Sequence, residues 1–516
     1  MVIRFWSNAQ ADPSRVALVD TRGIEWTAGE LLEASNAMVH RLRSVGMRAA
    51  DGVAVVLPNS AEMVVVYLAA MQAGWYLTPI NHHLVGHEIA HILADCEASV
   101  LIAHERFAKA VVEAVGLLDA PGPRCLSVGN IPGFESLREL LVDAPVTTPD
   151  DLAAGTVMYY TSGTTGRPKG VRRPLPGAHP EDASVPFADM LALLGIETQP
   201  DDVHLCGSPL YHTAVLAFAA AALHTAQTVV LMDKFTPAAM LDLIERYRIT
   251  NSHMVPTQFH RLLSLDDDER AEADVSSLRY VIHGAAPCSP DVKRRMIEWW
   301  GPVLYEYYGT TEGGGTFVAS DEWLERPGTV GRPWAGADIK ILDGHGNDVP
   351  SGTEGTVYIL LGDASFEYYK DTGKTAASRI GGYFTVGDIG VIDEDGFLYL
   401  KDRSADLIIA GGVNIYPVEI ENALLAHPAV GDVAVFGGPD PDLGERVVAV
   451  VEPARGVIAD GALRDELIRH CEASLARFKV PRELTFSDEL PRDPSGKLYK
   501  RKLRDAYRLA AATRTS

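Results

Sequence analysis

Short apolar runs typical of β-strands alternate with helical patterns up to about residue 400. Val53–Leu57 has the composition of a buried strand, and residues 61–73 have that of the helix after it. Residues 229–232 form another such run, which is followed by a helix start at Thr236 and Pro237. This alternation predicts an α/β fold with mostly parallel sheets, in which ligands bind at the loops that follow the strands.

The last hundred or so residues have a pattern of their own, typical of a separate domain. Apolar runs at 433–436, 447–451 and 483–486 predict strands, and residues 461–477 predict a helix. That helix carries one apolar stripe: Leu463, Leu467, Cys471 and Leu475. We therefore expect a large N-terminal domain of mostly parallel sheets with helices at 1–402, and a small mobile C-terminal α/β domain at 403–516.

The charge of the chain limits its partners. It has 516 residues, a net charge of -23 and a pI near 5.1, which argues against nucleic acids and anionic membranes. The longest apolar run, Ala214–Leu223, is shorter than the roughly 20 residues of a membrane-spanning helix and predicts a buried one. The N-terminus lacks the apolar segment of a signal peptide. Five scattered cysteines predict reduced thiols in the cytoplasm, and the sequence does not indicate an oligomeric state.

A loop rich in Gly, Ser and Thr, Tyr159–Gly170 (YYTSGTTGRPKG), carries the strongest functional signal. Glycines let backbone amides approach an anion, hydroxyls donate to its oxygens, and Lys169 adds positive charge. A P-loop needs a different spacing, with Ser or Thr after the lysine, whereas Gly170 stands there. We expect a phosphate site of another geometry rather than a plain surface turn. Its candidates are Thr161, Ser162, Gly163, Thr164, Thr165, Gly166 and Lys169.

Further motifs follow along the chain, and each has an ordinary structural explanation when taken alone. His212 could be a core histidine, Asp388 a turn carboxylate and Lys497 a solvated charge. The motifs are Pro209–Thr213, Gly284–Ala286, Tyr305–Glu312, Tyr383–Asp388, Lys401–Arg403 and Leu490–Lys497.

In this order, the motifs resemble those of the adenylate-forming superfamily, which contains acyl-CoA synthetases, aryl-CoA ligases, luciferases and adenylation domains of peptide synthetases. The resemblance extends from about Pro13 to Leu503. It implies a nucleotide site in which Tyr308 stacks on adenine, and Asp388 and Arg403 meet the ribose. It also adds these nucleotide-binding candidates: Gly284, Ala285, Ala286, Tyr307, Gly309, Thr310 and Thr311.

The resemblance implies a two-step reaction. A carboxylate attacks the α-phosphate of ATP, pyrophosphate leaves, and a thiol then attacks the acyl-adenylate. Lys497 and a Mg²⁺ ion on Glu312 would offset the charge of the first transition state, with Thr164 and His212 as further catalytic candidates. For the second step the small domain would rotate about Arg403, and Gly411 and Gly412 would line the path of the thiol.

Two positions depart from the superfamily pattern. The hinge position is usually Asp or Lys and is Ala405 here, so the superfamily's hinge contacts cannot be transferred. His283 replaces the usual Gly or Ser before Gly284, so the wall of the acid pocket cannot be transferred from the superfamily.

The function expected from these motifs is that of an acid–CoA ligase, which forms a carbon–sulfur bond with ATP, Mg²⁺ and coenzyme A. Small residues near the expected pocket, such as Ala214, Ala285 and Gly313, favour a medium- or long-chain fatty acid and a role in lipid metabolism. An aryl or steroid acid is an alternative. A carrier protein could replace CoA as the acceptor, and a non-catalytic nucleotide-binding relative is disfavoured because Glu312, Asp388 and Lys497 are all present.

A different class of function is suggested by His87-Glu88-Ile89-Ala90-His91, which matches the HExxH motif of zinc proteases. The two histidines would share a helix face, with Glu88 as general base and Glu105 or Glu113 as a third ligand. The neighbouring Ile89, Ile92 and Leu93 make an ordinary amphipathic helix, and the extended motif with a third histidine is absent. A zinc protease is therefore the remote alternative.

Overall fold

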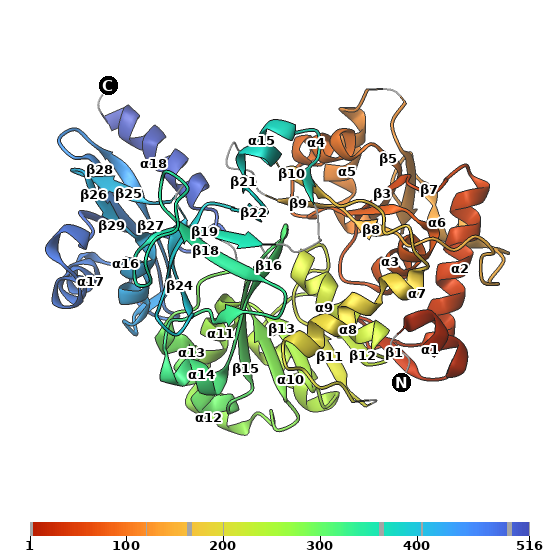
Figure 1. Ribbon diagram of the computed structural model, residues 1–516, viewed down its shortest axis with the longest axis horizontal. Coiled ribbons are helices and arrows are strands. Elements are labelled where there is room, and N and C mark those ends of the chain that lie inside the picture. The colour runs from red at the N-terminus through yellow and green to blue at the C-terminus, as the bar shows by residue number, and fades with distance from the viewer. Residues whose placement is uncertain are drawn as a thin grey trace.

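The computed structural model describes residues 4–119, 121–161, 168–199, 201–360, 366–403, 406–492 and 498–514, the last four of these as backbone only. The N-terminal helices and the C-terminal domain lie at opposite ends of the molecule, with the sheets of the middle of the chain between them (Figure 1). Among the described residues, none of the helices combines the length and the apolar character needed to span a bilayer.

The first sheet is parallel throughout, as the sequence predicts. Its strands follow the order β7-β6-β5-β3-β4-β8 among the described residues. The predicted helix at 61–73 is α3, and the predicted strand at 53–57 is β3 shifted by one residue. The elements are β3 (Gly52–Val56), β4 (Tyr76–Pro79), β5 (Ala98–His104), β6 (Arg124–Val128), β7 (Glu135–Ser136), β8 (Thr156–Val157), α2 (Ala28–Ser44), α3 (Ala61–Ala73), α4 (Gly86–Cys96), a 3-10 turn (Glu105–Phe107), α5 (Ala108–Gly116) and α6 (Leu137–Leu141).

The second sheet is parallel in its centre and antiparallel at both edges, in the order β17-β16-β15-β14-β13-β11-β12-β1-β2. The predicted buried helix at 214–223 is α9, which packs together with α3 in one apolar cluster between the two sheets. The elements are α1 (Phe5–Ala11), β1 (Val16–Val19), β2 (Glu25–Thr27), α7 (Pro180–Ala183), α8 (Val185–Leu193), β11 (Val203–Cys206), α9 (Thr213–His224), β12 (Thr228–Leu231), α10 (Pro237–Arg246), β13 (Asn251–Met254), α11 (Pro256–Leu263), α12 (Asp267–Glu272), β14 (Tyr280–His283), α13 (Pro290–Trp300), β15 (Leu304–Thr310), β16 (Gly313–Ala319), α14 (Ser320–Glu325) and β17 (Arg332–Pro333).

Two antiparallel sheets complete the large domain, and the strand–helix alternation in the sequence did not predict them. Short connections rather than helices join several of their strands, such as β21 to β22 and β23 to β24, so the chain reverses direction there. One sheet has the order β20-β10-β9, and the other β21-β22-β19-β23-β24 with β18 on β19. The elements are β9 (Tyr159–Thr161), β10 (Lys169–Arg172), β18 (Asp338–Leu342), β19 (Gly355–Leu360), β20 (Glu367–Tyr368), α15 (Thr372–Ala377), β21 (Arg379–Ile380), β22 (Tyr383–Phe384), β23 (Asp388–Ile392) and β24 (Leu398–Arg403).

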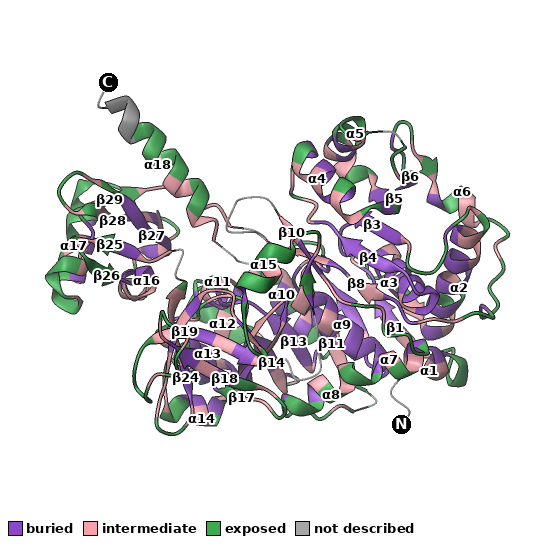
Figure 2. Cartoon of the chain, turned by 45° about the horizontal axis from the view of Figure 1, so that its top comes forward, coloured by how far each residue is buried: buried purple, intermediate pink, exposed green. Residues whose placement is uncertain are grey.

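The C-terminal domain is small and has its own apolar core. All three strands predicted there are present, but the helix ends at Ser474 rather than at 477, because Leu475 takes an extended backbone. The last helix, α18, extends away from the sheets at its far end (Figure 2). The elements are β25 (Ile408–Ala410), β26 (Val413–Ile415), α16 (Pro417–Leu425), β27 (Val430–Asp440), β28 (Gly444–Pro453), α17 (Gly461–Ser474), a 3-10 turn (Arg477–Lys479), β29 (Glu483–Phe486) and α18 (Lys500–Arg514).

Candidate functional site

Three of the predicted nucleotide-binding residues meet at one point although they are far apart in the sequence. The Tyr308 hydroxyl donates to Oδ2 of Asp388 at 2.7 Å, and Nε of Arg403 donates to Oδ1 of the same carboxylate at 3.2 Å. Asp388 and Arg403 stand opposite each other on β23 and β24, which fixes their pairing. Burial and the Asp388 charge raise the pKa of Tyr308, so its hydroxyl keeps its proton and acts as the donor.

A second cluster surrounds Glu312, which lies in the tight turn between β15 and β16. Its side chain is 95% buried, and Oε1 accepts a hydrogen bond from the Tyr368 hydroxyl at 2.7 Å. The described residues give Oε2 no hydrogen bond, so one carboxylate oxygen remains for another partner. A magnesium ion held between a protein and phosphates needs only one or two carboxylates, so this arrangement fits the ion.

Arg173, which the sequence analysis did not select, reaches the same turn from the end of β10. Its Nη2 donates to the backbone carbonyls of Thr311 at 2.9 Å and of Glu312 at 2.8 Å. Burial lowers the pKa of this guanidinium, and the Glu312 charge opposes that shift in part. Two adjacent arginines directly after a glycine-rich loop, in an acidic chain, are the signal that could have pointed to it.

The strands that flank the glycine-rich loop pair with each other, so that Lys169 stands opposite Thr161. The Lys169 ammonium forms an ion pair with Asp371. The neighbouring Arg172 lies between the rings of Tyr76, at 4.2 Å, and Tyr369, at 4.5 Å. The loop thus ends on strands tied to both the first sheet and the segment after β20.

The start of α9 approaches the Glu312 turn. His212 caps this helix, and its ring contacts that of Tyr211 at 4.3 Å between centroids. The hydroxyl of the next residue, Thr213, lies 3.4 Å from that of Thr311. The His212 motif and the Tyr305–Glu312 motif are therefore neighbours in space, as the resemblance implies.

The predicted adenine loop has an unusual backbone. Ala285 takes a positive φ of 67°, a conformation that costs a non-glycine residue about 1 kcal/mol or more and is common at binding sites. Gly284 has no room for a side chain, because a Cβ would lie 2.7 Å from Cε1 of Tyr307. The Tyr307 ring therefore covers this loop.

Tyr307 belongs to a group of rings beneath α9. Its hydroxyl lies 3.0 Å from Nε2 of His253, and the His253 ring stacks on Phe218 with centroids 5.1 Å apart. His283 does not line this group. It lies on the other side of the sheet, fully buried against Phe259.

Gly411 and Gly412 form the two-residue turn between β25 and β26. Both have positive φ angles, of 58° and 81°, as this kind of tight hairpin requires. A turn that needs left-handed residues at both positions explains the pair of glycines without reference to a ligand.

Several predicted residues lie outside the described residues: Ser162, Gly163, Thr164, Thr165, Gly166, Ala405 and Lys497. Described residues that lie near the last two in the sequence form a junction rich in charge. Nζ of Lys500 lies 2.9 Å from Glu421, and Arg504 lies 3.1 Å from Asp406. Burial raises the pKa of Asp402, which accepts from the backbone amide of Val418.

The HExxH residues lie on α4 as predicted, but the structure gives them other contacts. Glu88 accepts from the backbone amide of Val85 as part of the helix cap, and Nε2 of His91 lies 3.2 Å from the Pro168 carbonyl. Across the described part of the chain, no three His, Cys, Asp or Glu side chains are grouped as metal ligands.

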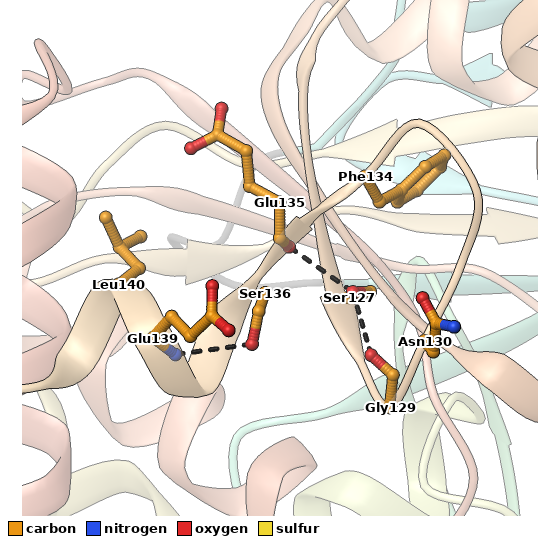
Figure 3. A pocket seen from close by; sticks show the side chains of 8 residues that line it. All are labelled: Ser127, Gly129, Asn130, Phe134, Glu135, Ser136, Glu139 and Leu140. Carbon is orange, nitrogen blue, oxygen red and sulfur yellow. Dashed lines mark hydrogen bonds between the residues drawn. The ribbon is translucent and has the colours of Figure 1, made fainter.

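The pocket in Figure 3 lies elsewhere, where β6, β7 and α6 meet. Polar groups dominate it, among them the Ser127 hydroxyl, which donates to the Gly129 carbonyl at 3.0 Å. A second pocket lies beside Arg22 and Asp242. Neither pocket includes a residue of the motifs, so the candidate site is defined by the motif clusters.

Two family models match the chain. The model for AMP-binding enzymes covers residues 5–369, and the model for the C-terminal domain of AMP-binding enzymes covers residues 419–497. The residues between the two models, 370–418, include Asp402 and Asp406 of the charged junction.

Similar proteins match over nearly the whole chain. A fatty acid–[acyl-carrier-protein] ligase, ScoC, of Streptomyces coeruleorubidus is 32% identical over 510 residues, which are 97% of this chain and 95% of that protein. A feruloyl-CoA synthase of an Amycolatopsis species is 33% identical over 495 residues, 94% of each chain. The solved structure of the anthranilate CoA ligase AuaEII with anthranoyl-AMP superposes with a TM-score of 0.85 at 26% identity, covering 99% of this chain and 98% of that one.

Proposed function

The chain belongs to the AMP-binding enzyme family, and on this premise we propose that it is an ATP-dependent acid–thiol ligase that forms a carbon–sulfur bond. The observation that carries the proposal is the meeting of Tyr308, Asp388 and Arg403 beside the Glu312 turn. The three residues come from separate motifs. Tyr308 offers an aromatic face, Asp388 offers an acceptor for a diol, and Glu312 beside them offers a carboxylate for a hard cation.

In the first step, a carboxylate oxygen of the acid attacks the α-phosphorus of ATP and the bond to pyrophosphate breaks. Asp388 and Arg403 would hold the ribose, the adenine would lie between Tyr308 and the Gly284–Ala286 loop, and the phosphates would lie along the loop that ends at Lys169. Lys497 would stabilise the charge that develops on the α-phosphate. Glu312 would hold Mg²⁺, which supplies charge neutralisation on the phosphates when bound.

In the second step, a thiolate attacks the acyl carbonyl, the acyl–phosphate bond breaks, and AMP leaves. We propose that residues 403–516 move as a domain between the steps, so that Lys497 withdraws and the Gly411–Gly412 turn approaches the thiol. CoA is our choice of acceptor, as it is for the feruloyl-CoA synthase relative. A carrier protein, the acceptor named for ScoC, is the second candidate.

The acid of this proposal is hydrophobic; one relative is named for a fatty acid and the other for a feruloyl group. The sequence analysis places a fatty acid first among the substrates, and the names of the two relatives give a fatty acid and an aromatic acyl group. All five cysteines are free thiols, which supports a reducing compartment such as the cytoplasm.

The test is a reaction with ATP, Mg²⁺, CoA and a panel of aliphatic and aromatic acids, followed by measurement of AMP, pyrophosphate and thioester. We expect all three products in equal amounts with at least one acid. Adenylate without thioester would point to a carrier protein as acceptor, and no pyrophosphate with any acid would refute the ligase.

A further inference from the structure

The rings beneath α9 lie where the acid of the proposed reaction must extend. Because Thr311 is a nucleotide-binding candidate, the carboxylate that attacks ATP would lie near it. The hydroxyl of Thr213, at the start of α9, lies 3.4 Å from the Thr311 hydroxyl. Phe218 follows five residues later on the same helix, about 7.5 Å along its axis at 1.5 Å per residue. The stacked group of Phe218, His253 and Tyr307 is therefore about one aromatic ring's length from the reacting carboxylate.

These rings would prevent a long acyl chain of the substrate from entering the space under α9. Phe218 is 95% buried and His253 is 98% buried, and the ring centroids of Phe218 and Tyr307 are 6.1 Å apart. Behind them lie further buried apolar side chains, including Leu191, Ala221 and Ile282. Tyr307, in contrast, is only partly buried, so its ring is the member of the group with surface left for a ligand.

The same group contains polar atoms that the described residues do not fully satisfy. Burial lowers the pKa of His253 to about 3, so the ring is neutral and offers one donor and one acceptor nitrogen. Nε2 is paired with the Tyr307 hydroxyl, whereas Nδ1 has no hydrogen-bond partner among the described residues. The Tyr307 hydroxyl has one proton and two lone pairs, and the bond to His253 uses one of these three.

A polar pair of this kind is unfavourable for stability at the base of a pocket that binds a plain alkyl chain. Burying a hydroxyl and an imidazole with incomplete hydrogen bonding costs stability, whereas Phe and Leu at these positions would not. A ligand group that bonds to the Tyr307 hydroxyl would offset that cost. A site built in this way discriminates strongly against an analogue that lacks the group.

We infer that Tyr307, oriented by His253, is a specificity-determining residue, and that the acid is a compact aromatic one with a hydrogen-bonding group opposite its carboxyl. This inference rests on the proposed function and deepens it, because it replaces the fatty acid favoured by the sequence with a substituted aromatic acid.

The test compares 4-hydroxycinnamic acid, cinnamic acid and palmitic acid as substrates in CoA-dependent AMP release. We expect kcat/KM to be at least about tenfold higher for the hydroxylated acid than for cinnamic acid, with palmitic acid below both. Preference for palmitic acid, or equal use of the two aromatic acids, would overturn the inference and leave the ligase standing. Failure of every acid in the wider panel would refute the ligase, and the inference with it.

Variants separate this role from a structural one. Tyr307→Phe keeps the ring and removes the hydroxyl, so we expect kcat/KM for 4-hydroxycinnamic acid to fall about 10- to 100-fold more than kcat/KM for cinnamic acid. His253→Phe should shift the preference in the same direction. The control is Tyr305→Phe, two residues away on β15, whose ring stacks on Phe317 and whose hydroxyl has no hydrogen bond among the described residues. An equal loss for both acids in Tyr307→Phe would contradict the assignment.

Discussion

Charged and polar groups gather at two places in this molecule, and they are used differently. At the nucleotide cluster, Asp388 and Glu312 accept hydrogen bonds from tyrosine hydroxyls and keep oxygen lone pairs for a ligand. At the domain junction, Lys500 and Arg504 are paired with Glu421 and Asp406, so opposite charges neutralise each other within the protein. The first place keeps acceptor oxygens that a ligand could use, whereas the described charges of the second are paired within the protein.

The difference indicates what each region does. Unused hydrogen-bonding capacity in a buried setting costs stability, and a bound ligand can offset that cost. Ion pairs between elements can instead fix the position of a segment, and Lys500 lies three residues after Lys497 in the sequence. We therefore propose that the large domain binds the nucleotide and that the junction helps to place Lys497.

The variant Lys497→Ala is expected to have the largest effect, which is on the rate of the chemical step. Removal of one group that stabilises transition-state charge typically lowers the rate by about 10²- to 10³-fold, and we expect that loss in acid-dependent ATP–pyrophosphate exchange. Transfer from a supplied acyl-adenylate to CoA should be nearly unchanged, because the proposed second step does not use Lys497.

Lys502→Ala is the matched control for this variant, since Lys502 is an exposed lysine at the start of α18. It should retain the exchange rate of the unchanged protein. Equal activity of Lys497→Ala and Lys502→Ala would remove the small domain from the proposed reaction.

The variant Lys500→Met is expected to have the next largest effect, which is on the free energy of unfolding. Burial lowers the pKa of Lys500, and the carboxylates of Glu421, Asp402 and Asp406 more than offset this, so its pKa lies above its ordinary value. The side chain is only 12% exposed, and removal of its charge leaves buried carboxylates unpaired, so we expect a loss of about 3 kcal/mol in unfolding free energy at pH 7.

The pH dependence of that loss tests its cause. Burial raises the pKa of Asp402, so its contribution to stability is full below its ordinary pKa and declines as the pH rises through the raised folded value. Lys500 offsets this penalty only while Asp402 is ionised. The loss in Lys500→Met should therefore be smaller near pH 4 than at pH 7 in denaturant titrations. An equal loss at both values would attribute it to packing.

A smaller effect is expected from Arg173→Met, which removes the two hydrogen bonds to the Thr311 and Glu312 carbonyls. A shift of about 1 Å in a catalytic group can lower a rate about 10²-fold, so we expect a 10- to 100-fold fall in kcat/KM for ATP. Arg173→Lys should recover part of it. Arg172→Met is the control, because Arg172 packs between two tyrosine rings and does not contact the turn. Equal kinetics in the two Met variants would refute a positioning role for Arg173.

The sequence predicted those parts of the fold that depend on local pattern. The helix at 61–73, the cap at Thr236 and the strand at 483–486 follow from periodicity and capping, and all three are confirmed. The antiparallel sheet around β19 was missed, because its strands are short and their pairing depends on hairpin turns rather than on a hydrophobic period.

The residues of the candidate site likewise include some that the sequence predicted and some that it did not. Motifs marked Tyr308, Asp388 and Arg403, and the structure brings them together. Arg173 and His253 were missed, because each acts through contacts with residues that are more than fifty positions away in the sequence. A single sequence contains no signal for such a contact beyond the residue type. Ala405 and Lys497, which the sequence singled out, lie outside the described residues and stay predictions.

The smallest effect concerns a contact that crosses from the small domain to the large one, the hydrogen bond between the Tyr416 hydroxyl and the Glu354 carboxylate. Tyr416→Phe removes this bond and keeps the ring, so we expect a loss of about 1 kcal/mol or less in unfolding free energy by denaturant titration. If the small domain is released between the steps, weakening this bond should leave pyrophosphate exchange unchanged and shift only the rate of thioester formation. A fall in the exchange rate would instead show that this contact helps to hold the arrangement used in the first step, and the junction would then belong to the catalytic region rather than contrast with it.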